Sequence, residues 1–187
     1  MKKAVIISAP SGSGKTSIVK YLLENKSDLV FSISCTTRKK RKKEIHKKDY
    51  YFVSVNDFKN KIQNKDFVEW EEVYENVFYG TLKDEIKRIW KLNKIIIFDI
   101  DVKGGINIKK YLKEKALAIF IKCPSIEENK KRLQLRGTES ENEIEMRVKK
   151  IKEENKKEKE FDLSVINKEF EKACSETLEK IQIFQNE

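Results

Sequence analysis

Short apolar runs alternate along this chain with longer segments in which apolar residues recur every three or four positions. The first kind predicts buried strands, and the second predicts amphipathic helices. The expected strands cover residues 4–7, 29–34, 95–100, 116–121 and 164–166. Because these runs are largely apolar and are separated by helices, they indicate a parallel sheet with helices on both faces.

The expected helices cover residues 15–24, 126 to about 136, 143–160 and 170–185, with a shorter one through Ile106 and Leu112. Four segments carry Ser or Thr followed three residues later by Asp or Glu, a pattern typical of helix N-termini. These segments begin at Ser54, Thr81, Ser125 and Ser140. We therefore expect two further helices, one after Ser54 and one after Thr81.

Residues 35–82 interrupt the alternation with short β-type runs at 50–53, 67–70 and 77–79, rich in aromatic residues and in charges of both signs. This stretch predicts an inserted mixed β/α lobe with its own task. A polar break between two helices predicts a small lid at about 137–147. The expected fold is one three-layer α/β domain whose parallel-sheet core is formed by 1–34, 83–136 and 148–187.

The segment AVIISAPSGSGKT at residues 4–16 carries the most specific motif. A strand, a loop of Gly and Ser, and a helix follow one another, which is the setting of a phosphate-binding P-loop. In such a loop the backbone amides bind polyphosphate, Lys15 reaches the β- and γ-phosphates, and Thr16 reaches Mg²⁺. The residues expected at ATP are Ser11, Gly12, Ser13, Gly14, Lys15, Thr16 and Ser17. Ala9 replaces the usual first Gly, which is tolerated when φ is negative.

Asp99 and Asp101 stand at the end of the apolar run at 95–100. Ligands of parallel sheets bind at the carboxyl ends of the strands. Asp99 fits the acid that orders Mg²⁺ and its waters beside a P-loop. Mg²⁺ is therefore the expected cofactor, held by Thr16 and Asp99 in part through water. The alternative is that Asp99 only caps the helix that follows.

The chain has 187 residues, of which 39% are hydrophobic, and this suits one globular domain. No apolar run approaches the roughly 20 residues of a membrane span, and no signal peptide is expected, so we predict a cytoplasmic protein. Cys35, Cys123 and Cys174 lack metal-ligand spacing and are expected to be buried or partly buried thiols in a reducing cytosol. His46 is expected to be solvated rather than catalytic.

A net charge of +10, with 41 basic residues, leaves nucleic-acid binding open. Most of these residues are Lys spread along the chain beside Glu, as on a solvated surface. Only six are Arg, and five of them form two clusters, Arg38 with Arg41 and Arg132 with Arg136 and Arg147. Because Arg binds phosphate in a bidentate manner that Lys cannot reproduce, the clusters predict two phosphate-facing sites.

The loop with the first Arg cluster is either a basic surface loop or a ligand site. Four residues of the same lobe, Tyr50, Glu69, Tyr79 and Thr81, favour a ligand. Tyrosine hydroxyls can donate to a phosphate, and a buried carboxylate can accept from the adjacent N1–H and N2–H groups of guanine, which adenine lacks. Ser and Thr hydroxyls can donate to guanine O6. Such a site rejects the wrong base by a factor of up to about 10⁴.

With these residues in view, the chain resembles the guanylate kinases over nearly its whole length. The matching segments are PSGSGKT (10–16), FSISCTTRKKR (31–41), KDYYFVSV (48–55), FVEW (67–70), YGT (79–81), DIDVKG (99–104), RLQLRGTE (132–139) and VIN (165–167). The resemblance implies transfer of the γ-phosphate of ATP to GMP and dGMP in purine metabolism, with ADP and GDP as products from GMP. Lys40, Lys43 and Lys168 depart from the family pattern, as does one extra residue near 75–77.

The resemblance also implies roles for single residues. Guanine would be read by Ser34, Glu69, Thr81 and Asp101. The GMP phosphate would be bound by Arg38, Arg41, Tyr50 and Tyr79. Arg136 and Arg147 would clamp the transferring phosphates on the ATP side, with Arg132 nearby and Asn167 near the adenine. The expected catalytic residues are Lys15, Arg38, Arg136 and Arg147.

The implied reaction is in-line attack of a GMP phosphate oxygen on the γ-phosphorus of ATP. It needs positioning and charge neutralisation rather than a strong base, because that oxygen is already anionic near neutral pH. A hinged lid and the GMP lobe would close together and exclude water.

Three other functions stay open beside this one, and the first of them is nucleic-acid binding by the basic surface, which we expect to be only weak and non-specific. The P-loop would also serve a kinase of another nucleoside monophosphate or of a ribose bisphosphate. Modules that resemble guanylate kinases bind phosphopeptides without catalysis. ATP and GMP or dGMP are the expected partners, without a specific nucleic acid or a membrane, and the chain is expected to be a monomer or a homodimer.

Overall fold

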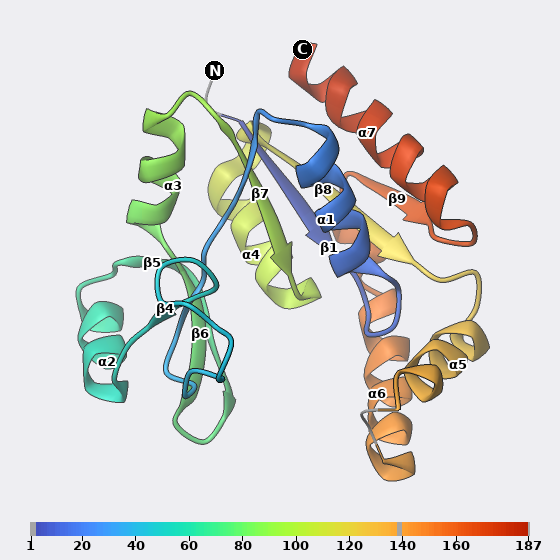
Figure 1. Ribbon diagram of the computed structural model, residues 1–187, viewed down its shortest axis with the longest axis horizontal. Coiled ribbons are helices and arrows are strands. Elements are labelled where there is room, and N and C mark those ends of the chain that lie inside the picture. Colours follow the sequence, from blue (N-terminus) through green and yellow to red (C-terminus); the bar gives the residue numbers. More distant parts are fainter. Residues whose placement is uncertain (1–2, 138–139, 187) are drawn as a thin grey trace.

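The larger of two sheets forms the centre of the molecule, whose computed structural model describes residues 3–137 and 140–186. Its five strands have the order β2-β7-β1-β8-β9, and every neighbouring pair is parallel. They are β1 (Ala4–Ser8), β2 (Leu29–Phe31), β7 (Ile95–Ile100), β8 (Ala116–Lys122) and β9 (Leu163–Ile166). The expected parallel sheet is therefore confirmed (Figure 1).

Helices cover both faces of this sheet, as its apolar strands require. They are α1 (Lys15–Asn25), α7 (Phe170–Asn186), α3 (Lys83–Lys91) and α4 (Val102–Leu112). The core beneath α1 and α7 contains Val5 and Ile7. The core beneath α3 and α4 contains Ala4 and Ile6. Successive residues of β1 thus enter opposite cores, because side chains alternate along a strand.

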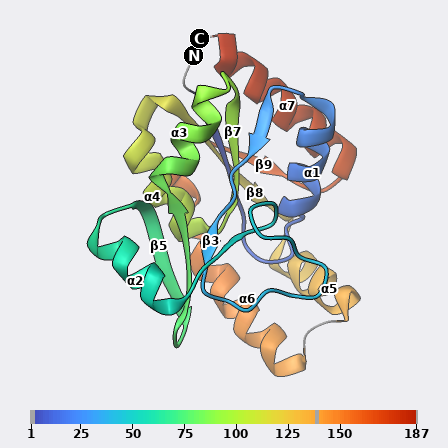
Figure 2. The ribbon, with the colours of Figure 1, turned by 60° about the vertical axis from the view of Figure 1, so that its left-hand side comes forward.

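A smaller mixed sheet forms a lobe beside the main sheet, below α3 in Figures 1 and 2. Its strands are β3 (Cys35–Thr36), β4 (Tyr51–Phe52), β5 (Phe67–Tyr74) and β6 (Val77–Leu82), in the order β4-β3-β6-β5. Helix α2 (Val55–Gln63) packs on this sheet through Phe58. The centre of the Phe58 ring lies 4.4 Å from the centre of the Phe67 ring and 5.2 Å from that of Phe78. The lobe therefore has an aromatic core of its own.

Two helices form a second projection on the other side of the molecule (Figure 1). They are α5 (Ile126–Arg136) and α6 (Glu141–Asn155), packed through Leu133, Ile144 and Ile151. The helix expected over 143–160 is therefore shorter, and the 3₁₀ helix η2 (Glu158–Glu160) follows it; η1 (Lys113–Lys115) follows α4. Thr138 and Glu139 of the expected lid lie outside the described residues.

Three of the four predicted helix caps are confirmed. The side chains of Ser54, Ser125 and Ser140 each accept a hydrogen bond from the backbone N–H three residues later. The cap predicted at Thr81 is wrong, because β6 stays paired with β5 as far as Leu82, which itself precedes α3. Sheet pairing thus holds Thr81 in the strand, where it is buried.

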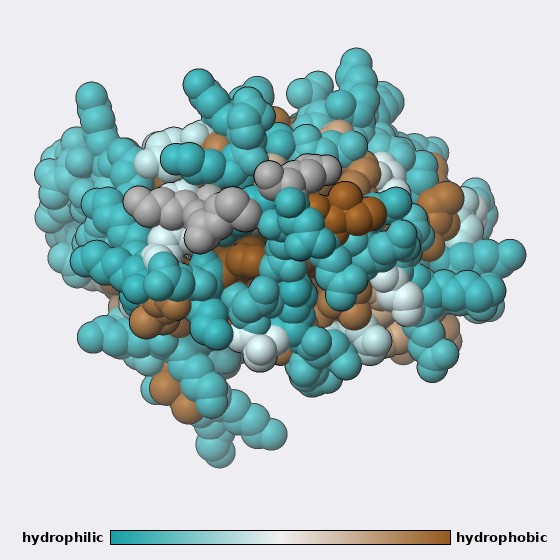
Figure 3. Space-filling model, turned by 90° about the horizontal axis from the view of Figure 1, so that it is seen from above, coloured by the Kyte–Doolittle hydropathy of each residue, from teal (hydrophilic) through white to brown (hydrophobic). Residues whose placement is uncertain are grey.

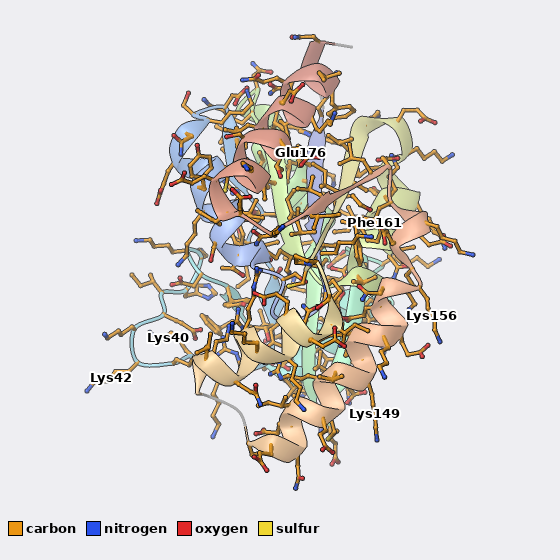
Figure 4. The ribbon with its side chains drawn as sticks, turned by 90° about the vertical axis from the view of Figure 1, so that its right-hand side faces the viewer. Lys40, Lys42, Lys149, Lys156, Phe161 and Glu176 are labelled. Carbon is orange, nitrogen blue, oxygen red and sulfur yellow. The ribbon has the colours of Figure 1, made fainter. Side chains whose placement is uncertain are left out.

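The surface agrees with the solvated, Lys-rich exterior expected from the sequence. The face in Figure 3 is largely hydrophilic, with separate hydrophobic patches. Lys40 and Lys42 project from an exposed loop, Lys149 from α6 and Lys156 from the turn that follows α6 (Figure 4). Among the described helices, none is both long and apolar enough to cross a membrane. The cysteines are buried free thiols, as predicted.

Candidate active site

The loop between β1 and α1 turns at two glycines with left-handed backbones. Gly12 has φ 80° and Gly14 has φ 86°, and α1 begins directly afterwards at Lys15. Such turns bring successive backbone N–H groups onto one concave surface, and the first turn of α1 adds N–H groups that have no partner within the helix. The segment predicted to be a P-loop therefore has the backbone of a phosphate site.

Asp99, at the end of β7, is bound to the start of α1. Its carboxylate accepts a hydrogen bond from the Thr16 hydroxyl at 2.9 Å and pairs with the Lys15 ammonium at 2.5 Å. The helix that follows is capped instead by Asp101, which accepts a hydrogen bond from the Gly104 N–H at 2.7 Å. The alternative in which Asp99 only caps α4 is therefore wrong.

A cavity of about 270 Å³ lies in front of the P-loop. It is lined by residues 9–16 and by Asp101, Arg136, Arg147, Lys150 and Glu154. Arg147 reaches it from α6 and donates a hydrogen bond to the Ser11 hydroxyl at 2.8 Å. The cavity thus brings Lys15 together with two arginines of separate helices, and such a set of cations can hold a polyphosphate.

Sequence reasoning missed two residues of this cavity, Lys150 and Glu154. They follow Arg147 on α6 by three and seven residues, which is the helical spacing that could have indicated them. Their charged groups lie 3.6 Å apart. Burial raises the pKa of Glu154, and the negative charge of Asp101 adds to the effect. The cavity therefore contains carboxyl groups as well as cations.

Three further residues expected at ATP lie around the loop. Ser17 is exposed in the first turn of α1. Asn167 follows β9, is buried, and donates from Nδ2 to the Ser13 carbonyl at 2.8 Å. Arg132 of α5 donates to the Asn167 carbonyl at 3.0 Å and pairs with Glu128. Arg132 and Asn167 thus contact each other beside the P-loop.

A second cavity, of about 200 Å³, lies between the lobe and the main sheet. Its lining residues are Ser34, Tyr50, Glu69, Glu71, Val73, Tyr79, Gly80, Asp99, Ile100 and Asp101. Asp101 lines this cavity and the P-loop cavity alike. Ligands bound in the two cavities would therefore meet at Asp101.

Glu69 and Thr81 lie opposite each other on the paired strands β5 and β6. Burial raises the pKa of the Glu69 carboxyl to about 7, although hydrogen bonds from Thr81 act against this. A carboxylate that is largely withdrawn from water binds strongly to a ligand that offers N–H donors. The structure thus brings together two of the residues expected at guanine.

Arg38 contacts the two tyrosines that are expected to bind the GMP phosphate with it. Its Nε donates to the Tyr79 hydroxyl at 3.1 Å, and its guanidinium lies 5.2 Å from the centre of the Tyr50 ring. Its terminal nitrogens donate to Glu44 at 2.7 and 3.0 Å, which raises the pKa of Arg38 and lowers that of Glu44 to about 2. The side chain of Arg41 is exposed. Sequence reasoning missed Glu44. Its carboxylate binds the two terminal nitrogens of Arg38 that a phosphate would need.

Comparison with known proteins decides the family. A family model described as guanylate kinase matches residues 1–183. The chain belongs to the guanylate kinase family. Curated guanylate kinases of Bacteroides thetaiotaomicron and Porphyromonas gingivalis are 45% and 47% identical to it, over 98% and 96% of this chain and 90% and 96% of theirs. The crystal structure of guanylate kinase from Anaplasma phagocytophilum matches with a TM-score of 0.76 at 26% identity, over 99% of this chain and 87% of that one.

Membership of the family establishes the reaction. Guanylate kinases phosphorylate GMP to GDP with ATP, so this chain is a phosphotransferase, as the resemblance of its motifs implied. A guanylate kinase has to hold two nucleotides at the same time. The two cavities that share Asp101 are the candidate sites for them.

Guanine binding by this guanylate kinase is expected to weaken in acid because of Glu69. A carboxyl with a pKa of about 7 is increasingly protonated as the pH falls, and only its ionised form accepts two N–H groups. From pH 8 to pH 6, we expect the Kd of guanosine, which has no phosphate to titrate, to rise about tenfold. Isothermal titration calorimetry measures this Kd, and a constant value over the range would contradict a carboxyl with a pKa of about 7 at the base.

Proposed function

We propose that this guanylate kinase binds ATP in the P-loop cavity and GMP or dGMP in the second cavity. The observation that carries the assignment is that Asp101 lines both cavities. Phosphoryl transfer requires the attacking and leaving oxygens to lie roughly in line through the phosphorus. Cavities that adjoin at a single residue support this arrangement of acceptor and donor.

On the ATP side, the phosphates would bind the backbone N–H groups of the loop. The residues proposed for ATP are Ser11, Gly12, Ser13, Gly14, Lys15, Thr16, Ser17, Arg132, Arg136 and Asn167. Lys15, Arg136 and Arg147 would neutralise the charge of the group in transfer, which lowers the barrier most when the cations are held in place beforehand. Arg132 and Asn167, which contact each other beside the loop, would border the adenine.

On the GMP side, Glu69 would accept from N1–H and N2–H of guanine, while Ser34 and Thr81 would donate to O6. Asp101 would complete the base site. Arg38, Arg41, Tyr50 and Tyr79 would bind the phosphate. Because Glu44 already pairs with Arg38 in a bidentate manner, the arriving phosphate would replace one anion by another at the partly buried guanidinium.

The oxygens of Thr16 and Asp99 fit a role at Mg²⁺. They lie 2.9 Å apart beside the P-loop, and hard oxygen donors suit this ion. In the described part of the chain, no three His, Cys, Asp or Glu side chains form a metal cage. This agrees with an ion held mainly by phosphates and water. Mg²⁺ would supply further charge neutralisation to the bound phosphates.

We propose a division of the chain that follows from these sites. The core comprises 1–34, 83–136 and 148–187, the GMP lobe 35–82, and the lid about 137–147. Closure of lobe and lid on the core would exclude water and limit ATP hydrolysis. The three buried free cysteines of the described chain support a reducing compartment, and we place the enzyme in the cytoplasm.

Profiling of acceptors tests the proposed function. ADP release is measured by a coupled assay with ATP, Mg²⁺ and GMP, dGMP, AMP, CMP or UMP in turn. We expect rapid turnover with GMP and dGMP, and rates lower by about 10³-fold or more with the others. Equal turnover with another monophosphate would contradict the guanine assignment. The absence of turnover with every acceptor would favour a phosphopeptide-binding module.

A further inference from the structure

Three consecutive carbonyl groups of the P-loop each accept a hydrogen bond from a side chain outside the loop. We call these side chains the carbonyl cradle: Asn129 of α5, Cys123 after β8 and Asn167 after β9. Asn129 Nδ2 donates to the Ser11 carbonyl at 2.9 Å, Cys123 Sγ to the Gly12 carbonyl at 3.5 Å and Asn167 Nδ2 to the Ser13 carbonyl at 2.8 Å. Segments far apart in the sequence thus converge on one short stretch of backbone.

The cradle determines where the N–H groups of the loop point. In a trans peptide the C=O and the N–H point in opposite directions, and the described chain contains no cis peptide bond. A carbonyl of Ser11 held against α5 therefore directs the N–H of Gly12 away from Asn129, and Gly12 lines the P-loop cavity. In the same way, the Ser13 carbonyl, which Asn167 holds, directs the N–H of Gly14 away from Asn167. The cradle thus preorganises donors for phosphate.

Asn129 donates two hydrogen bonds to the loop. The residue is 2% exposed, and its Nδ2 also donates to the Ser13 hydroxyl at 3.2 Å. A Cβ on Gly12 would lie 3.0 Å from the Asn129 carbonyl oxygen, so α5 packs directly against the loop. Burying an amide costs free energy unless its hydrogen bonds are made. The packing of α5 alone would require only an apolar side chain at this position, such as that of Leu133 one turn later. The donors of Asn129 therefore serve the loop.

The same helix carries Arg136, which lines the ATP cavity seven residues after Asn129. Because α5 is continuous between them, the contact of Asn129 with the loop also sets the place of the Arg136 backbone relative to the phosphates. In Figure 1 the loop between β1 and α1 lies beside α5. One helix thus positions both the backbone donors and an arginine of the ATP site.

We propose that Asn129 is a positioning residue of the ATP site, which acts through the P-loop without touching the nucleotide. The inference rests on the proposed binding of ATP in the P-loop cavity. Without the two donors of Asn129, the peptide between Ser11 and Gly12 loses its external partner, and the N–H of Gly12 is no longer held toward the phosphates. Affinity for ATP and ADP then falls, while the GMP site, lined by other residues, is unaffected.

The test replaces Asn129 by Leu, which has a similar size and no donors. We expect the Kd of ADP and the KM of ATP to rise about tenfold, which corresponds to the loss of one or two buried hydrogen bonds. The Kd of GMP, measured by calorimetry without ATP, stays within about twofold of the wild-type value, as does the KM of GMP. Asn129→Asp keeps the shape but removes the donors, and it is expected to weaken ADP binding at least as much.

Ile151→Val is the matched control. Ile151 is fully buried in the cluster between α5 and α6, so this variant loses stability without touching the loop carbonyls. Its affinity for ADP should equal that of the wild type. Thermal melting of each variant confirms folding before the titrations.

The outcomes separate the inference from the proposed function. If the wild type binds ADP and phosphorylates GMP while Asn129→Leu binds ADP equally well, the inference is wrong and the proposed function stands. If Asn129→Leu loses affinity for ADP and GMP alike, its role is merely structural and the inference is also wrong. If the wild type binds no ADP, the proposed function fails and the inference fails with it.

Discussion

Replacement of Lys15 by Ala is expected to lower the kcat of this guanylate kinase by about 10³-fold or more. The Lys15 ammonium pairs with Asp99 at 2.5 Å and donates to the Ile100 carbonyl at 2.9 Å, so it is held in place at the P-loop before any nucleotide binds. In the proposed mechanism, a fixed cation at this point would neutralise charge that develops as the phosphoryl group moves. Ala removes the charge and leaves the amides of the loop, so ATP binding should weaken less than kcat.

The coupled ADP-release assay with saturating ATP and GMP measures this effect. Lys20→Ala is the matched control, because Lys20 lies on the exposed face of the same helix and should be replaceable without loss. Thermal melting is compared as well, since Asp99 loses an ion pair in the Lys15 variant. If Lys15→Ala keeps more than about a tenth of the wild-type kcat, Lys15 does not have the catalytic role proposed for it.

Local signals in the sequence were sufficient for most of the fold. The caps at Ser54, Ser125 and Ser140 are confirmed because each depends on residues one turn away. The apolar runs located the strands of the main sheet because a strand buried on both faces has to be apolar throughout. The P-loop was found for a similar reason, since its glycines are required by the backbone conformation itself.

Contacts between distant segments could not be predicted in this way. Thr81 carries a local cap signal, yet its pairing with β5 overrides it. Glu44 is one charged residue among many in its loop until Arg38 is seen to bind it. Asn129 lies at an ordinary helical position, and only the packing of α5 against the P-loop shows what its amide contacts. The missing information in each case is tertiary.

Replacement of Glu69 by Gln is also expected to have a large effect, and should lower the kcat/KM for GMP by about 10³-fold. The carboxylate can accept both N1–H and N2–H of guanine, and its buried place between the lobe and the main sheet makes those hydrogen bonds strong. Gln keeps the size of the side chain but turns one acceptor into a donor. That donor then faces a donor of the base, and both are left unpaired.

IMP separates this effect from a general loss of activity, because its base keeps N1–H and lacks the N2 amine. In the Glu69→Gln variant, the oxygen of the new side-chain amide can still accept from N1–H of IMP, and the NH₂ group of that amide then opposes no donor. We therefore expect the kcat/KM for IMP to fall by only about 30-fold, so that the preference for GMP over IMP shrinks markedly in the variant. The assays are run at pH 8, above the raised pKa of Glu69, so that the wild-type carboxyl is ionised. Equal losses for GMP and IMP would contradict a carboxylate that accepts from both N–H groups of guanine. A side chain that contacts only N1–H, or neither group, would be insensitive to the presence of the N2 amine.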